Sequence, residues 1–137
     1  AQPLERGFNN YYSIIQGGDF VTDVKKAFLS LMHDAYFDAK YAHQYSTETE
    51  NAPENPSAAI AYANSVTAKA CAAEAIYWCN EELYHDEIPE LLHQFRVFSA
   101  EILQSYATDH SRQWVSIEFD NLKDLFESSV CNQPITE

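Results

Sequence analysis

Apolar residues recur at intervals of three and four along almost the whole chain, and this spacing predicts helices rather than strands. The clearest stretch covers residues 56–84, which contain nine alanines and, between Pro56 and Asn80, only two charged side chains, Lys69 and Glu74. A helix that is apolar on most of its circumference is usually enclosed by other elements. We therefore expect helix 56–84 to be the centre of the fold.

Four further helices are predicted around it. A short apolar segment, 8–16, should end at Gly17-Gly18, because glycine accepts the left-handed backbone of a helix C-cap. A long helix with one apolar stripe follows over residues 20–46. Similar stripes predict helices over residues 88–108 and 112–130.

Local signals mark where these helices begin. Asn55 is a suitable N-cap with Pro56 at the first helical position, and Ser111 is a suitable cap for the last helix. The glutamate-rich segment 47–55 is a solvated loop, and no stretch shows the alternation of a strand. Because short connections place long helices antiparallel, all 137 residues are predicted to form one all-α domain. Its expected architecture is an antiparallel four-helix bundle with an additional short N-terminal helix.

The charge limits the classes of partner. The formal net charge is -13, from 21 acidic and 8 basic residues. This balance argues against direct nucleic-acid binding and against an anionic membrane surface, both of which need clustered Lys and Arg. It favours a basic protein partner, since complementary fields speed association, while a role in solubility alone stays open. No apolar run is long and uncharged enough to suggest a membrane span.

Two acidic clusters are candidates for partner binding. The first lies at the junction between the predicted helices 56–84 and 88–108 and consists of Asp86, Glu87 and Glu90. The second lies in the loop before the Ala-rich helix and consists of Glu48, Glu50 and Glu54.

Two Glu-x-x-His pairs raise the question of a metal site. They are Glu82 with His85 and Glu90 with His93. On a helix this spacing places both ligands on one face, as di-iron bundles require. Those bundles use pairs from different helices, whereas these two lie close together across Pro89. A solvated polar corner is the favoured interpretation, and no cofactor is expected.

Glu74 is the second chemical question. It lies in the most apolar part of the Ala-rich helix, where an unpaired carboxylate would be costly. We expect Lys, Arg or Tyr partners, or a raised pKa. A buried structural hydrogen bond is favoured over a catalytic base.

A row of polar residues follows one face of helix 20–46. The row lies off the apolar stripe, and it could form a site or a polar outer face. The residues off the stripe are His33, Asp34, Tyr36, Lys40 and His43. Four of them, His33, Tyr36, Lys40 and His43, share a face because they step by three and four.

The cysteines suggest a reducing compartment. Cys71 and Cys79 lie eight residues apart on one helix, roughly 12 Å, which is beyond disulfide reach. We expect free buried thiols in the cytoplasm, although a bridge from Cys131 to one of them stays open. The initial Ala1-Gln2-Pro3 is also compatible with signal-peptide cleavage.

The segments Ala27–Ala42 and Ala58–Asn80 resemble the HEPN superfamily of small helical bundles. That family often pairs a helix of the first kind with an Ala-rich helix ending in a Glu-Ala and aromatic or Asn pattern. The resemblance covers about the first two thirds of the chain and implies a commonly dimeric domain. Many members are ribonucleases with an Arg followed, after four to six residues, by His. None of Arg6, Arg96 and Arg112 has a histidine at that distance, so the resemblance implies a partner-binding member with no catalytic residue carried over.

These observations favour a non-catalytic interaction protein, with antitoxin, immunity and inhibitor proteins as the types considered. No nucleophile elbow or phosphate-binding glycine loop is present. The alternatives are an enzyme, either a degenerate ribonuclease or a metal-dependent oxidase, and a carrier with an apolar cavity between its helices. The wide apolar circumference of helix 56–84 also predicts a homodimer.

Overall fold

The computed structural model describes residues 16–133, with the surroundings of side chains from residue 23 onward. Four α-helices follow one another and one short 3-10 turn joins the middle pair. They are α2 (Gln16–Tyr45), α3 (Pro56–Cys79), η1 (Glu81–Leu83), α4 (Ile88–Ala107) and α5 (Gln113–Glu127). This part of the chain contains no strand, which confirms the all-helical prediction. The short helix predicted over 8–16 lies outside the described residues, apart from Gln16, which belongs to α2.

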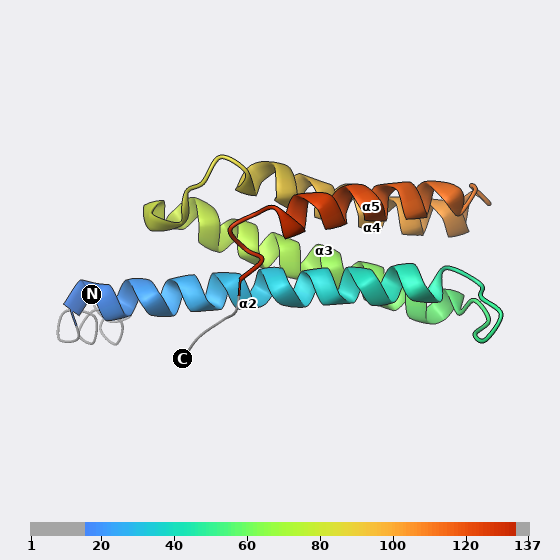
Figure 1. The fold of residues 1–137 in the computed structure, drawn as a ribbon, viewed down its shortest axis with the longest axis horizontal. Helices are drawn as coiled ribbons and strands as arrows, with labels where there is room; N and C mark the ends of the chain where they lie inside the picture. Colours follow the sequence, from blue (N-terminus) through green and yellow to red (C-terminus); the bar gives the residue numbers. More distant parts are fainter. Residues whose placement is uncertain (1–15, 134–137) are drawn as a thin grey trace.

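The helices lie along a common long axis, and their connections alternate between the two ends of the molecule (Figure 1). The loop after α2 and the turn between α4 and α5 lie at one end. The η1 turn lies at the other, near the beginning of α2. α2 packs against α3, α4 packs against both α3 and α5, and α2 also contacts α4 and α5. After α5, the C-terminal segment, residues 128–133, crosses toward α2.

The beginning of α3 follows the predicted chemistry. The Asn55 side-chain oxygen accepts a hydrogen bond from the Ala58 backbone N–H at 3.2 Å, with Pro56 in the first turn. Ser111 is not the N-cap of α5, because Arg112 occupies that position without a side-chain cap, but the Ser111 hydroxyl still accepts from the Gln113 N–H at 3.2 Å. Both contacts occupy N–H groups that a helix start leaves free.

Three helix ends differ from the prediction. α3 ends at Cys79, before residue 84, because Asn80 adopts an extended backbone and its side-chain NH₂ donates to the Ile76 carbonyl at 2.8 Å. α5 ends at Glu127, where the Ser128 hydroxyl donates to the Asp124 carbonyl at 2.8 Å. Gly17-Gly18 lies in the first turn of α2 and does not end a preceding helix there.

The centre of the core is α4 rather than α3. α4 supplies six of the twelve largest fully buried side chains, namely Ile88, Leu91, Leu92, Phe95, Phe98 and Ile102. α3 buries only one stripe, whose members repeat every three or four residues: Ala59, Ala63, Val66, Ala70, Ala73 and Tyr77. Alanine is apolar but small, so it allows helices to approach closely without filling volume. The larger side chains of α4 therefore form the centre that the sequence pattern assigned to α3.

Candidate functional site

A groove opens at the end of the molecule where α2, η1 and the C-terminal segment meet. α2 lines it with Lys25, Phe28 and Leu29, while Val130 and Gln133 line it from the C-terminal segment. The remaining wall is formed by residues 82–85. The cavity has a volume of about 180 Å³. We call this the end groove.

The end groove has an apolar floor and a more polar rim. Phe28, Leu29 and Leu83 are almost completely buried and form the floor. Tyr84 and Val130 are much more exposed, at 47% and 38%. An apolar floor with a few polar groups around it is the usual composition of a binding pocket.

Tyr77 holds the wall of the groove in place. It is buried at the end of α3, and its hydroxyl donates to the His85 carbonyl at 3.2 Å and accepts from the His85 N–H at 3.3 Å. Its ring lies 6.2 Å from that of Phe28 on the floor. A single buried side chain therefore fixes both the turn after η1 and its position against α2.

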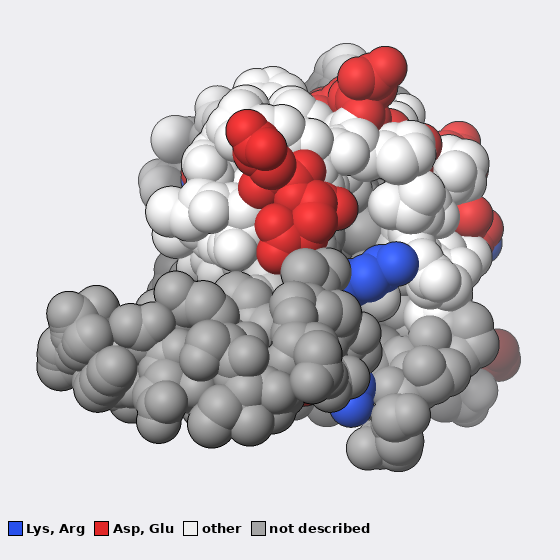
Figure 2. All heavy atoms as spheres, turned by 90° about the vertical axis from the view of Figure 1, so that its left-hand side faces the viewer, with Lys and Arg blue, Asp and Glu red and all other residues white. Residues whose placement is uncertain are grey.

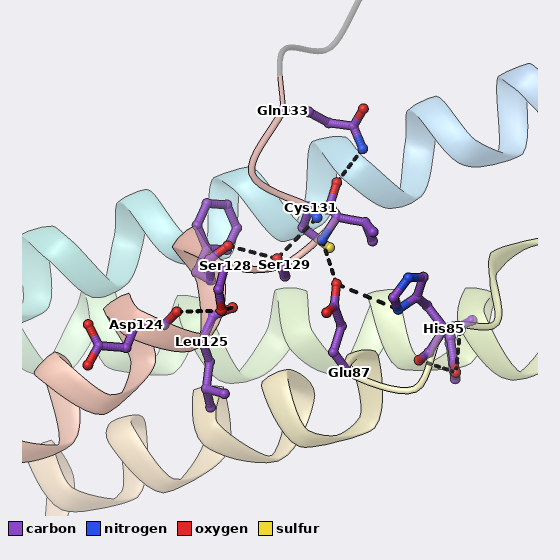
Figure 3. A network of polar contacts seen from close by, with 11 residues as sticks. His85, Glu87, Asp124, Leu125, Ser128, Ser129, Cys131 and Gln133 are labelled. Atoms are coloured by element: carbon purple, nitrogen blue, oxygen red, sulfur yellow. Dashed lines mark hydrogen bonds and ion pairs between the residues drawn. The ribbon is translucent and has the colours of Figure 1, made fainter.

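Glu87 attaches the C-terminal segment to the same wall (Figure 3). Its carboxylate accepts from the Val130 N–H at 2.6 Å and lies 3.6 Å from Nδ1 of His85. Further along, His33 of α2 donates from Nε2 to the Cys131 carbonyl at 2.8 Å. Contacts from α2 and from the start of α4 thus fix Val130 at the rim.

Cys131 takes no part in disulfide chemistry in this structure. All three thiols are free, and only that of Cys131 is buried, so the expectation of buried thiols is wrong for Cys71 and Cys79. Burial raises the pKa of the Cys131 thiol to about 12. Cys71 and Cys79 are exposed on α3, and the Arg96 guanidinium of α4 donates to the Cys71 sulfur at 3.8 Å.

Acidic side chains gather on the same end of the molecule (Figure 2). Four exposed carboxylates lie in or close to the connection between α3 and α4: Glu81, Glu82, Asp86 and Glu90. Among residues 23–133, none of these four has a side-chain hydrogen bond or ion-pair partner. Glu87 differs, since its contact with Val130 makes it part of the scaffold. Of the predicted junction cluster, Asp86 and Glu90 are therefore the members available to a partner.

Two exposed aromatic residues border the groove. Trp78, at the end of α3, is 54% exposed and packs edge-on against Tyr84 with ring centroids 5.8 Å apart. The Tyr84 hydroxyl donates to the Trp78 carbonyl at 3.2 Å. Trp and Tyr dominate the energetically important positions of protein interfaces. Periodicity alone assigns such residues to the core, so the sequence did not identify this pair.

The Glu-x-x-His pairs do not form a metal cluster. No group of three or more His, Cys, Asp or Glu side chains suited to a metal occurs in the part of the chain that the structure describes. Glu82 lies in the 3-10 turn and His85 follows it, so this pair has lost the shared helical face that the spacing predicted. Glu90 and His93 do lie on α4, where both are exposed to solvent.

Glu74 is not buried. Its side chain is 34% exposed and forms an ion pair with Arg96 of α4, while it also accepts from the Trp78 indole N–H at 3.4 Å. The Arg96 hydrogen bond lowers the pKa of this carboxyl. The expected Arg partner is present, but the expected burial is wrong, and the alternative of a raised pKa is wrong as well. Because a pairing partner keeps the group ionised, Glu74 is a structural link between α3 and α4.

The polar row on α2 lies at the interface with α5. Tyr36 is buried and stacks on Phe126 with centroids 4.1 Å apart, and burial raises its pKa to about 12. His43 stacks on Phe119 at 4.6 Å and lies 3.0 Å from the Ser116 hydroxyl. Burial lowers the His43 pKa. The row is therefore mainly a helix-packing surface, and of its five members only Asp34 and Lys40 are exposed.

The second acidic cluster is divided. Glu48 and Glu50 are exposed, but Glu54 accepts from the Tyr106 hydroxyl at 2.6 Å and from Nη2 of Arg112 at 2.8 Å. These hydrogen bonds lower the Glu54 pKa, with that of Tyr106 the largest cause. No sequence signal links Glu54 to Arg112, because 58 residues separate them.

Comparison with family models, curated proteins and solved structures found no match to this chain. Among the residues searched for membrane spans, 16–133, no helix combines the length and the apolar character that a crossing requires. The functional argument therefore depends on the end groove and its surroundings.

Proposed function

We propose that the protein is a non-catalytic interaction protein, of the antitoxin, immunity or inhibitor type, that binds a basic protein partner through its acidic end. The observation that carries this proposal is a set of exposed carboxylates that have no side-chain partner among the described residues: Glu81, Glu82, Asp86 and Glu90. Glu82 lines the end groove itself. A cationic partner would relieve the mutual repulsion of these carboxylates and would be steered toward this end by the field of the whole molecule.

The scaffold suits this role. An antiparallel four-helix bundle, which is our interpretation of the four helices, presents a fixed surface and needs no reaction chemistry. We also propose that the chain is a HEPN-like bundle. Because it lacks the ribonuclease motif of that superfamily, this resemblance implies a domain that binds a partner.

The size of the groove argues for a protein partner over a small ligand. Small-molecule sites usually have volumes of roughly 300–1,000 Å³. The end groove has about 180 Å³ and is lined by α2, by residues 82–85 and by the C-terminal segment. It is better matched to one side chain of a larger partner.

Charge reversal tests the proposal. The partner is captured with the full chain, identified, and its association rate measured at low salt for the double variant Asp86→Lys and Glu90→Lys. Loss of the attractive field should slow association by roughly tenfold and change dissociation much less. Glu87 is left intact because it holds Val130.

The matched control reverses the same number of charges at the opposite end, with Glu48→Lys and Glu50→Lys. This variant carries the same change in net charge, so its association rate should fall less. Equal rates for the junction variant and the unmodified protein would rule out binding through the acidic end.

A further inference from the structure

The end groove has the capacity of a single bulky apolar side chain. Its volume is about 180 Å³, and an apolar cavity of about 150 Å³ in another protein is sufficient for a benzene ring. The floor of Phe28, Leu29 and Leu83 offers only apolar surface to such a group. An aromatic or branched aliphatic side chain would therefore bury most of its area there.

The groove walls are held by contacts independent of any ligand. Tyr77 fixes His85 on one side, and Glu87 fixes Val130 on the other. A binding site whose walls are already fixed loses little conformational freedom on binding. This favours a preformed pocket for an anchoring side chain.

The surroundings of the groove select a cationic segment. Glu82 lies on the rim, and Glu81 and Asp86 are exposed in the same connection. Tyr84 lines the groove with an exposed ring, and the exposed ring of Trp78 packs against it. An arginine side chain can stack on an aromatic ring while its guanidinium hydrogen-bonds a carboxylate. Among the described residues, Lys25 is the one lysine or arginine that lines the groove.

We propose that the end groove, with Trp78 and Tyr84, binds a segment of the partner in which one bulky apolar side chain is flanked by arginine or lysine. This inference rests on the proposed function and specifies the chemistry of the partner. The apolar side chain occupies the groove, and its basic neighbours meet Glu81, Glu82 and Asp86. The two kinds of contact are separable by experiment.

Three labelled peptides test the two contacts with the full chain. The first is Gly-Lys-Arg-Phe-Arg-Lys-Gly, the second has serine in place of phenylalanine, and the third has glutamate in place of all four basic residues. Binding is measured by fluorescence anisotropy at low salt. We expect the serine and glutamate peptides to bind at least about tenfold more weakly than the first.

A groove-filling variant provides the second measurement. Val130→Trp places a large side chain at the rim, and Ile117→Trp on α5 is its matched control, because both positions are 38% exposed and only Val130 lines the groove. Val130→Trp should weaken binding of the phenylalanine peptide by about tenfold and leave the serine peptide unchanged. Ile117→Trp should change neither, and matching circular dichroism should show that both variants fold.

The outcomes separate this inference from the proposed function. Equal binding of the phenylalanine and serine peptides, or no effect of Val130→Trp on binding, would show that no apolar side chain of the partner occupies the end groove. Charge-driven association would still stand. Absence of binding by all three peptides would also overturn the inference. A loss of self-association in Val130→Trp would instead assign the groove to a second copy of the chain. The proposed function fails separately, through unchanged association of the Asp86→Lys and Glu90→Lys variant.

Discussion

The carboxylates of this protein fall into two groups according to what faces them. Glu54, Glu74 and Glu87 each accept a hydrogen bond from a distant part of the chain and join elements together. Asp86 and Glu90 have no such partner among the described residues. Identical chemical groups therefore serve the scaffold or the surface, depending on the neighbours that folding brings to them.

Glu54 provides a test of this distinction by pH. Folding lowers the pKa of the Glu54 carboxyl from its unfolded value near 4.5. The ionised carboxylate therefore contributes to the free energy of unfolding at pH values above 4.5, and this contribution is lost as the pH falls through the lower pKa of the folded state. Glu54→Gln should lower the free energy of unfolding by about 1 kcal/mol at pH 7. The difference should shrink when pH is lowered toward 3.

Denaturant unfolding at the two pH values measures this effect. Glu50→Gln is the control, since Glu50 lies in the same loop, is exposed and loses the same charge. It should change the free energy of unfolding by less than about 0.5 kcal/mol. Equal effects of the two substitutions at pH 7 would show that the contacts to Tyr106 and Arg112 contribute nothing.

At the scale of elements, α3 has two different faces. Its inner face carries the buried alanines that allow α2 to approach closely. Its outer face includes exposed Ala61, Ala68 and Ala75, together with Cys71. The sequence assigns both faces a similar apolar character, and only the neighbours distinguish them.

Paired substitutions on α3 test this assignment. Ala70 is fully buried and Ala68 is exposed. Ala70→Leu should destabilise the protein by about 1–3 kcal/mol, because the added volume has no space between the helices. Ala68→Leu should change stability by no more than about 0.5 kcal/mol. Thermal unfolding of the two variants measures the difference, and similar melting temperatures would refute the described packing.

At the scale of the whole molecule, the outer face of α3 is a weakly charged surface on a strongly acidic protein. Lys69 pairs with Asp38 at 2.7 Å and Glu74 pairs with Arg96, so both charges of α3 are neutralised within the chain. A second copy could approach this face without bringing unpaired carboxylates of α3 together. The helix is 24 residues, or roughly 36 Å, long. This face is where we place the predicted homodimer.

Sedimentation tests the homodimer. We expect a dimer at micromolar concentration that becomes tighter with added salt, because salt screens the repulsion between two chains of charge -13. Ala68→Arg should weaken the dimer by at least about tenfold, whereas Asp34→Arg on α2 should not. A mass of 15.6 kDa throughout the micromolar range would contradict the prediction.

Helix content and helix starts were largely predictable, because they depend on neighbouring residues. The spacing of apolar residues predicted α4 over almost its exact length, and Asn55 caps α3 as expected. The end of α3 was less predictable, since it depends on the backbone and side chain of Asn80. Of the candidate site, the sequence indicated the acidic junction but not the groove beside it.

The amino-acid sequence by itself determined that this protein is helical, acidic and without recognisable catalytic motifs, because these properties follow from local spacing and composition. Only the tertiary structure decided which surfaces are buried and which carboxylates are paired. Phe28, Leu83 and Val130 meet although about 100 residues separate the first from the last. The end groove depends on such distant contacts, which local periodicity does not specify.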